Sequence, residues 1–245
     1  MTPSFLPPLL QPPHDPTWLA LDAQQGWRAA TLDTAELSPG AGALTLAVAA
    51  GDRSMVEESG SLGGLVPPRN VAVDGDGGVM LLDLLDCVLK RYDPCSCTFL
   101  RIPGVGGKGA GPRQFADPHA IAIAGGNLFV ADTGNRRVSV FTLNGYQLRS
   151  TLKPPAAAGL AQPWTPYALA TDAEGRLYVS DPANGCVHRF SRARRWEMSI
   201  SGLGTVHQLA VDCVGQLYVG VAGEEPVVRL YDAHGRQVGN ATRAG

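Results

Sequence analysis

The stretch IAIAGGNLFVADTGNRRVSVF, residues 121–141, combines the features that decide the fold of this chain. It begins with a short apolar run centred on alanine, turns at a glycine, continues in a second apolar run and ends a third run on an aromatic ring. Its opening triplet recurs with the central alanine at positions 20, 72, 122, 170 and 210. The triplets are Leu19-Ala20-Leu21, Val71-Ala72-Val73, Ile121-Ala122-Ile123, Leu169-Ala170-Thr171 and Leu209-Ala210-Val211. The chain therefore contains internal repeats with a period of about 40 to 50 residues.

Two further sequence features recur with the same period. A glycine follows each triplet, and in the last four repeats an aromatic residue closes the third apolar run. The glycines are Gly26, Gly78, Gly126, Gly175 and Gly215, and the aromatic residues are Tyr92, Phe141, Phe190 and Tyr231. Triplets without polar alternation indicate strands buried on both faces, and glycine allows the positive φ of a tight turn. One repeat of this length matches one four-stranded propeller blade.

The third repeat, residues 109–141, resembles the NHL repeat, most specifically in Asp132-Thr133-Gly134-Asn135-Arg136-Arg137-Val138. Residues 181–184 keep part of this motif, residues 83–86 keep less, and the fifth repeat has Val221 in place of the aspartate. No Trp-Asp pair ends a third strand, which argues against a WD-type propeller. The resemblance implies an all-β fold, an NHL-type β-propeller with about five blades, five or six in number.

The two ends of the repeat array leave closure of the ring open. The first repeat is degraded and precedes an irregular stretch, and the fifth ends soon after a turn at Asp232-Ala233-His234-Gly235. The ring is five-bladed, or Ala43 to Val48 help build an extra partial blade, or the ring stays incompletely closed and a partner completes it. An open sheet edge would favour pairing with another chain.

The repeats predict a single propeller domain, residues 14–245, and it follows a proline-rich arm, residues 1–13. A net charge of −2 argues against nucleic acid as the main partner. No apolar stretch is long enough to span a bilayer. Five cysteines, an odd number, fit reduced thiols, so we predict a cytoplasmic protein.

The proline-rich arm has two interpretations. Its prolines exclude a helix or a central strand, so it is either a disordered tail or an extended segment that docks on a neighbouring subunit. The apolar residues available for docking are Phe5, Leu6, Leu9 and Leu10.

Four residues lie shortly before the predicted inner strands, at what would be one mouth of the central channel: Arg69, His119, Tyr167 and His207. A resemblance to propeller lyases and lactonases, which place metal ligands there, raises a metal-dependent enzyme as an alternative. Two histidines are fewer than the three protein ligands usual for catalytic zinc, and Arg69 would repel a cation. We therefore predict no metal, no cofactor and no enzymatic activity.

Three other motifs are weaker indications of a binding site. Residues 104–109 match a dinucleotide fingerprint but lead toward Pro112 and another strand rather than a helix. Cys95 and Cys97 could bind a soft metal, whereas Cys87 and Cys186 are interpreted as small residues filling one repeated position. Arg192, Arg194 and Arg195, next to Trp196, resemble the surface of NHL propellers that bind single-stranded RNA, and we interpret them as a solvated turn.

A narrower resemblance concerns Asp93-Pro94-Cys95-Ser96-Cys97-Thr98-Phe99 and the early residues 15–22. Both are similar to NHL-containing phage-tail-type proteins of bacterial contractile injection systems. The resemblance implies protein partners, as subunits of a larger particle. We predict a non-catalytic protein-binding or structural assembly module, with a lyase or lactonase and a single-stranded RNA-binding protein as alternatives.

Overall fold

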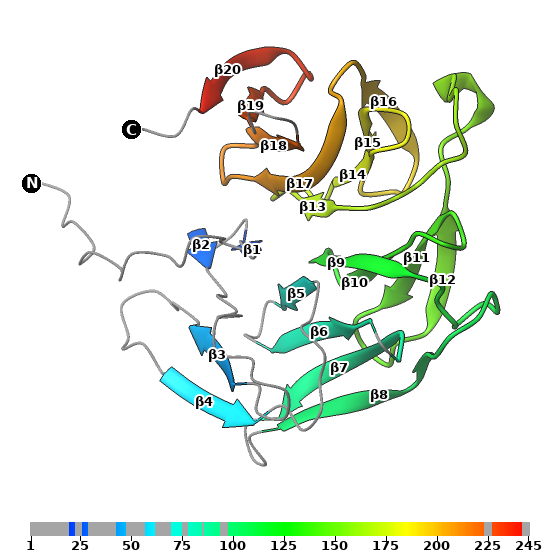
Figure 1. Cartoon of the computed structure of the whole chain (residues 1–245), viewed down its shortest axis with the longest axis vertical. Helices are drawn as coiled ribbons and strands as arrows, with labels where there is room; N and C mark the ends of the chain where they lie inside the picture. Colours follow the sequence, from blue (N-terminus) through cyan, green and yellow to red (C-terminus); the bar gives the residue numbers. More distant parts are fainter. Residues whose placement is uncertain are drawn as a thin grey trace, which may run out of the picture.

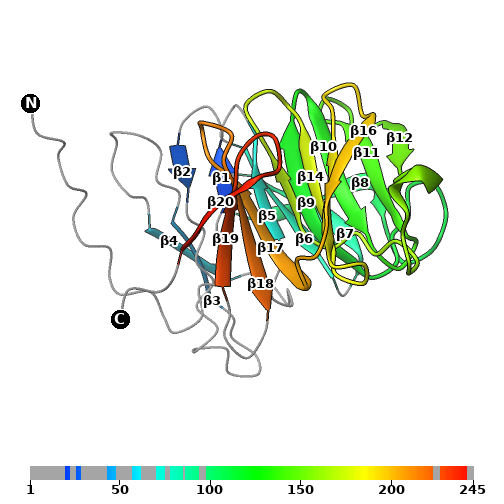
Figure 2. The same cartoon turned by 90° about the horizontal axis from the view of Figure 1, so that it is seen from above.

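The computed structural model describes residues 20–22, 26–28, 43–47, 57–61, 70–74, 78–84, 86–93, 98–222 and 227–241. These residues form four four-stranded antiparallel sheets, two two-stranded sheets and one short 3-10 turn, η1 (Ala156–Ala158). The four larger sheets are arranged around a common centre (Figure 1), and their strands run between the two faces of the ring (Figure 2). The prediction of an all-β propeller is confirmed.

Each larger sheet is a meander of four consecutive strands, and we name these sheets blades A to D in chain order. Blade A consists of β5 (Asn70–Val73), β6 (Val79–Asp83), β7 (Val88–Asp93) and β8 (Thr98–Gly106). Blade B consists of β9 (Pro118–Ala124), β10 (Asn127–Asp132), β11 (Arg137–Thr142) and β12 (Leu148–Leu152). Blade C consists of β13 (Leu169–Thr171), β14 (Leu177–Asp181), β15 (Cys186–Phe190) and β16 (Trp196–Ile200). Blade D consists of β17 (Thr205–Val211), β18 (Leu217–Ala222), β19 (Val227–Tyr231) and β20 (Gln237–Ala241).

The first strand of each blade faces the centre of the ring (Figure 1). β5 contacts β9, β9 contacts β13, and β13 contacts β17. The strand of the first repeat, β1 (Ala20–Asp22), pairs with β2 (Gly26–Arg28) and contacts both β5 and β17. The inner strands thus form a circle in which β1 joins blade D to blade A.

The stretch that begins at Ala43 forms β3 (Ala43–Ala47), which pairs with β4 (Glu57–Ser61) in a separate two-stranded sheet. Residues 43–47 are therefore a strand, as expected if Ala43 to Val48 help build an extra partial blade. The sequence left open whether the ring closes. The contacts of β1 with β5 and β17 favour a ring that is closed by the first repeat.

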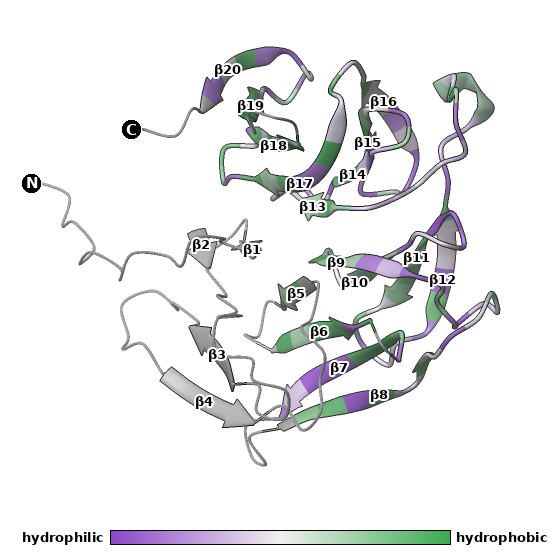
Figure 3. Ribbon diagram, viewed as in Figure 1, coloured by the Kyte–Doolittle hydropathy of each residue, from purple (hydrophilic) through white to green (hydrophobic). Residues whose placement is uncertain are grey.

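The hydrophobic core lies between adjacent blades. Between blades A and B, Met80 and Leu82 pack with Phe115, Leu128 and Phe141, and similar clusters join B to C and C to D. The second strands β6, β10 and β14 are buried at every position, as expected for strands covered on both faces. Figure 3 shows hydrophobic residues along β6 and β13, and hydrophilic residues on β7 and β16.

Local features of the repeat follow the sequence pattern. The closing aromatic residues Phe141, Phe190 and Tyr231 are buried, and Tyr92 contacts Phe99 with ring centroids 5.3 Å apart. Gly175, with φ of 77°, adopts the positive φ that its turn requires. Residues 107–117 lead from β8 to β9 through turns and one isolated bridge rather than a helix, which excludes the dinucleotide interpretation.

Several sequence-based predictions fall outside the described residues: the arm with Phe5, Leu6, Leu9 and Leu10, the channel residue Arg69, and the pair Cys95 and Cys97. Within the part of the chain that the structure describes, no helix has the length and apolar character needed to cross a bilayer.

Candidate functional site at the channel mouth

Three aromatic side chains from consecutive blades stack at one end of the ring. They are His119 on β9, Tyr167 just before β13, and His207 on β17. The His119 and Tyr167 ring centroids are 4.2 Å apart, and those of Tyr167 and His207 are 4.9 Å apart with an interplanar angle of 28°. The structure therefore brings together three of the four residues that the sequence placed at the mouth.

An irregularity in strand pairing presents each of these rings. The register of β9 against β10 shifts at His119, which is the extra residue between two paired neighbours, and β17 shifts in the same way at His207. In blade C, Tyr167 N–H donates to the Ser180 carbonyl at 3.0 Å, while Ala168 N–H donates to the Ser180 hydroxyl at 2.8 Å. A β-bulge re-aims a side chain, so each of these blades points one ring at the mouth.

Hydrogen bonds fix the orientation of His119. Its Nδ1 lies 2.9 Å from the Asp117 carbonyl oxygen and 3.0 Å from Thr133 Oγ1. A carbonyl oxygen only accepts, so Nδ1 carries the hydrogen, and the lone pair of the neutral imidazole is on Nε2. The Thr133 hydroxyl donates to the Pro166 carbonyl at 2.6 Å and thereby connects blade B to the segment that carries Tyr167.

Exposure increases along the stack. The His119 side chain is 9% exposed, Tyr167 is half-buried, and His207 is exposed. The stack is therefore an ordered row of rings with one end anchored in blade B and the other facing solvent.

In blade B, the NHL-like motif holds the segment that leads to His119. The Asp132 side chain is fully buried and accepts from Ala116 N–H at 2.8 Å, from Asn135 Nδ2 at 2.9 Å and from Arg137 Nε at 2.7 Å. Arg137 also donates to the Gly111 carbonyl at 2.7 Å. The motif thus tethers the connection between blades A and B.

Blade C keeps part of this tether. Asp181 accepts from Asn184 Nδ2 at 2.7 Å and from Thr165 N–H at 3.3 Å, and Asn184 accepts from Gln162 N–H at 2.8 Å. These bonds hold the segment that delivers Tyr167. In blades B and C, the aspartate of the repeat therefore acts on the mouth indirectly, by holding the segment before the inner strand.

A buried cluster in blade C was missed by the sequence analysis. Cys186 Sγ lies 3.3 Å from His188 Nε2, which lies 3.6 Å from Asp181 Oδ2. Burial raises the pKa of the Cys186 thiol to about 12, and the negative charge of Asp181 acts in the same direction. Within the described residues, this is the group of three potential ligands close enough to hold a metal ion, and the histidines of the mouth belong to no such group.

The assignment of Cys87 and Cys186 to one repeated position was wrong by one residue. Strand pairing joins Asp83 to Val88 and Asp181 to Cys186, so Val88 is the equivalent of Cys186. Cys87 lies in the preceding turn with φ of 53°. Counting five residues from each aspartate would have given the correct alignment and revealed the polar cluster.

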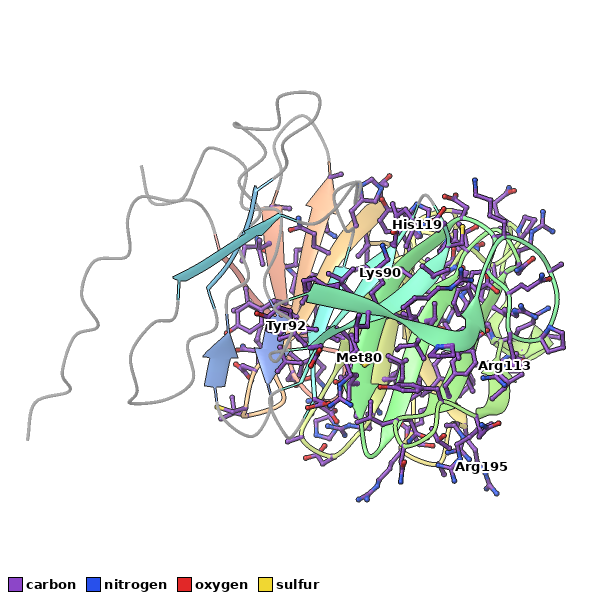
Figure 4. All side chains as sticks on the ribbon, turned by 90° about the horizontal axis from the view of Figure 1, so that it is seen from below. Met80, Lys90, Tyr92, Arg113, His119 and Arg195 are labelled. Carbon is purple, nitrogen blue, oxygen red and sulfur yellow. The ribbon has the colours of Figure 1, made fainter. Side chains whose placement is uncertain are left out.

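The arginine cluster lies far from the channel mouth. Figure 4 shows His119 and Arg195 at opposite ends of the blades. Arg194 and Arg195 belong to the turn between β15 and β16, where their backbone N–H groups bond to Ser191. Trp196 is half-buried and packs against the cluster between blades B and C, which leaves little of its ring for base stacking.

Comparison with known proteins agrees with the architecture. The model of the NHL repeat matches residues 115–141. A structure of the nidogen/laminin complex aligns with a TM-score of 0.59 and 16% identity over 91% of this chain and 78% of the other. A catalytically inactive virginiamycin B lyase from Staphylococcus aureus with quinupristin aligns with a TM-score of 0.59 and 10% identity over 82% and 64%.

Hydrazine synthase from Kuenenia stuttgartiensis also aligns, with a TM-score of 0.55 and 16% identity over 76% of this chain and 52% of that one. No curated protein sequence matches the chain. The protein is thus a β-propeller with one unit that matches the NHL repeat, and at these identities the structural likeness concerns the fold alone.

Proposed function

We propose that this chain is a non-catalytic propeller that binds a protein partner through the channel mouth. The observation that carries the proposal is the row of rings formed by His119, Tyr167 and His207, anchored at one end and exposed at the other. A side chain already held in place loses little conformational entropy on binding, and tyrosine, the residue at the centre of the row, is enriched among those that dominate protein interfaces.

The finer part of the proposal is that the partner belongs to a phage-tail-like contractile injection particle. Its support is the local resemblance of residues 93–99 and 15–22 to proteins of that kind. In this setting the apolar residues of the arm, Phe5, Leu6, Leu9 and Leu10, provide a second contact with a neighbouring subunit.

The test is to purify the tagged protein from its native host with its companions, and then to measure the affinity of the reconstituted pair. We expect Tyr167→Ala to raise Kd by about 30-fold or more, because truncating a central aromatic residue at an interface costs about 2 kcal/mol or more. The matched control, Arg195→Ala at the opposite end of the blades, should leave Kd unchanged. Equal effects of both variants would overturn the assignment of the mouth.

A metal-dependent lyase or lactonase is the enzymatic alternative. It draws on the fold shared with virginiamycin B lyase and on the two histidines of the mouth. Turnover of a small substrate that disappears in the His119→Ala/His207→Ala double variant would establish this alternative and end the proposal of a non-catalytic module.

A further inference from the structure

Three blades end their second strand on a buried aspartate, and each compensates the carboxylate in its own way. In blade A, Lys90 Nζ lies 2.7 Å from Asp83 Oδ2, and in blade B, Arg137 Nε lies 2.7 Å from Asp132 Oδ2. In blade C, within the described residues, no lysine or arginine forms an ion pair with Asp181. A buried carboxylate is costly unless hydrogen bonds or a cation compensate it, and the ionisable side chain beside Asp181 is His188, whose Nε2 lies 3.6 Å from Asp181 Oδ2.

Strand pairing shows what replaced the two cations. Cys186 occupies the position of Arg137, directly opposite the aspartate, and His188 occupies the position of Lys90, two residues further along the third strand. Blade C therefore has cysteine and histidine, two typical metal ligands, beside the aspartate at the positions where blades B and A have arginine and lysine. Asp181 and His188 are 0% exposed and Cys186 is 2% exposed.

Two of the three separations between the ligand atoms are close to those around one small ion. Zinc bonds of about 2.0 to 2.3 Å in a tetrahedral arrangement place neighbouring ligand atoms about 3.4 to 3.6 Å apart. The observed separations are 3.3 Å between Cys186 Sγ and His188 Nε2 and 3.6 Å between that nitrogen and Asp181 Oδ2, and all three atoms lie within 4.8 Å of one another.

Neighbouring groups orient the ligands. His188 Nδ1 lies 2.8 Å from Ser199 Oγ, so a hydrogen on Nδ1 can be donated to the hydroxyl while Nε2 turns its lone pair toward the cluster. Asn184 holds Asp181 Oδ2 at 2.7 Å, and the Trp164 ring packs edge-on against His188 with centroids 6.4 Å apart. Such partners, which fix ligand orientation, are characteristic of metal sites in proteins.

We propose that Asp181, Cys186 and His188 bind one Zn²⁺ ion at the interface between blades B and C. Binding exchanges the thiol proton of Cys186, which is released to solvent, for a sulfur–zinc bond. The ion supplies the charge that Lys90 and Arg137 supply in blades A and B, and a second carboxylate oxygen or a water molecule completes four-coordination. We expect its role to be structural, because all three ligands are buried and Asp181 also holds the segment that carries Tyr167.

The experiment uses the full chain purified without a metal-affinity tag, stripped with chelator during unfolding and refolded with Zn²⁺ or Co²⁺. We expect one equivalent of metal per chain, a thiolate-to-cobalt charge-transfer absorption band, and a higher Tm with Zn²⁺ than without. Cys186→Ser and His188→Gln should each weaken Zn²⁺ binding by at least about 100-fold, more than the loss typical when only a group that orients a ligand is removed.

Two sets of controls separate this site from other metal binding. Cys87→Ser and Cys213→Ser should keep the cobalt band, and so should His119→Ala/His207→Ala at the mouth. Cys186→Arg/His188→Ser restores the residues of blade B and should fold with a Tm that does not respond to Zn²⁺. The proposal is overturned if the folded wild-type protein binds no stoichiometric Zn²⁺, if the cobalt band persists in Cys186→Ser, or if the blade B exchange keeps the Tm response.

Discussion

Blades B and D hold the segment before their bulged first strand by different interactions. In blade B, the segment before the bulge at His119 is held by the buried Asp132 and its partners. In blade D, Val221 stands in the position of Asp132, and the segment before the bulge at His207 is held by strand pairing from Thr205 and by the buried Leu203. The bulge occurs in both blades, so the bulge itself does not require the aspartate.

Removing the aspartate from blade B should give the largest effect. We expect Asp132→Ala to lower the free energy of unfolding by about 3 to 5 kcal/mol, because it leaves the mostly buried Arg137 without its carboxylate partner. Val221→Ala in blade D should cost only about 1 to 2 kcal/mol, since it removes apolar volume and leaves no charge unpaired. Denaturant unfolding of both variants measures the difference, and equal losses would contradict a polar tether in blade B.

Transplanting the tether into blade D sharpens the comparison. Val221→Asp alone should destabilise the protein by burying an unpaired carboxylate, and Val227→Arg, at the position of Arg137, should restore part of the loss. We expect a coupling free energy of about 1 to 3 kcal/mol from the double-mutant cycle. Additive effects of the two substitutions would show that the carboxylate–arginine pair needs the particular connection of blade B.

The bridge between blades B and C should contribute less, and Ala222, at the position of Thr133 in blade D, has no hydroxyl that could form it. Thr133→Val removes the hydroxyl that accepts from His119 and donates to the Pro166 carbonyl, and we expect a loss of about 1 to 2 kcal/mol. Thr151→Val, at an exposed position on β12, should change stability by less than about 0.5 kcal/mol. Thermal or denaturant unfolding of the two variants measures the difference. If Thr133→Val left stability unchanged, the hydroxyl bridge would not stabilise the mouth.

The smallest expected effect is the pH dependence of an exposed turn in blade D. Hydrogen bonds from the backbone N–H groups of Arg236 and His234 lower the pKa of Asp232 below its ordinary value of 3.8. A lowered pKa in the folded state means that this contribution is present above the ordinary pKa and is lost as pH falls through the lowered value.

The corresponding variant is Asp232→Asn. Its unfolding midpoint should differ from that of the wild type at neutral pH, and the difference should shrink under strongly acidic conditions. A difference that stays constant from neutral to acidic pH would show that the carboxylate charge plays no part in this turn.

The sequence predicted the propeller because the buried inner strand imposes a repeated constraint. Ala72, Ala122, Ala170 and Ala210 all lie in first strands of blades, where neighbouring strands approach closely and a small residue is required. The positions before these strands could be aligned by counting back from the triplets, which is why His119, Tyr167 and His207 were identified together.

Contacts that depend on strand register were harder to predict. The bulges at His119 and His207 shift the pairing by one residue, and no residue type marks this shift in the sequence. The cluster of Cys186 and His188 was missed for a related reason, because its partner Asp181 belongs to another strand and is brought close only by the hairpin between β14 and β15.

The position of β1 between β5 and β17 has a consequence for the order of folding. Blades A to D each pair strands that are neighbours in sequence, whereas the contact of residues 20–22 with β17 closes a loop that includes almost the entire propeller. The entropy of closing so long a loop makes this contact slow to form. We therefore expect the seam between β1 and β17 to be the last joint of the ring to assemble.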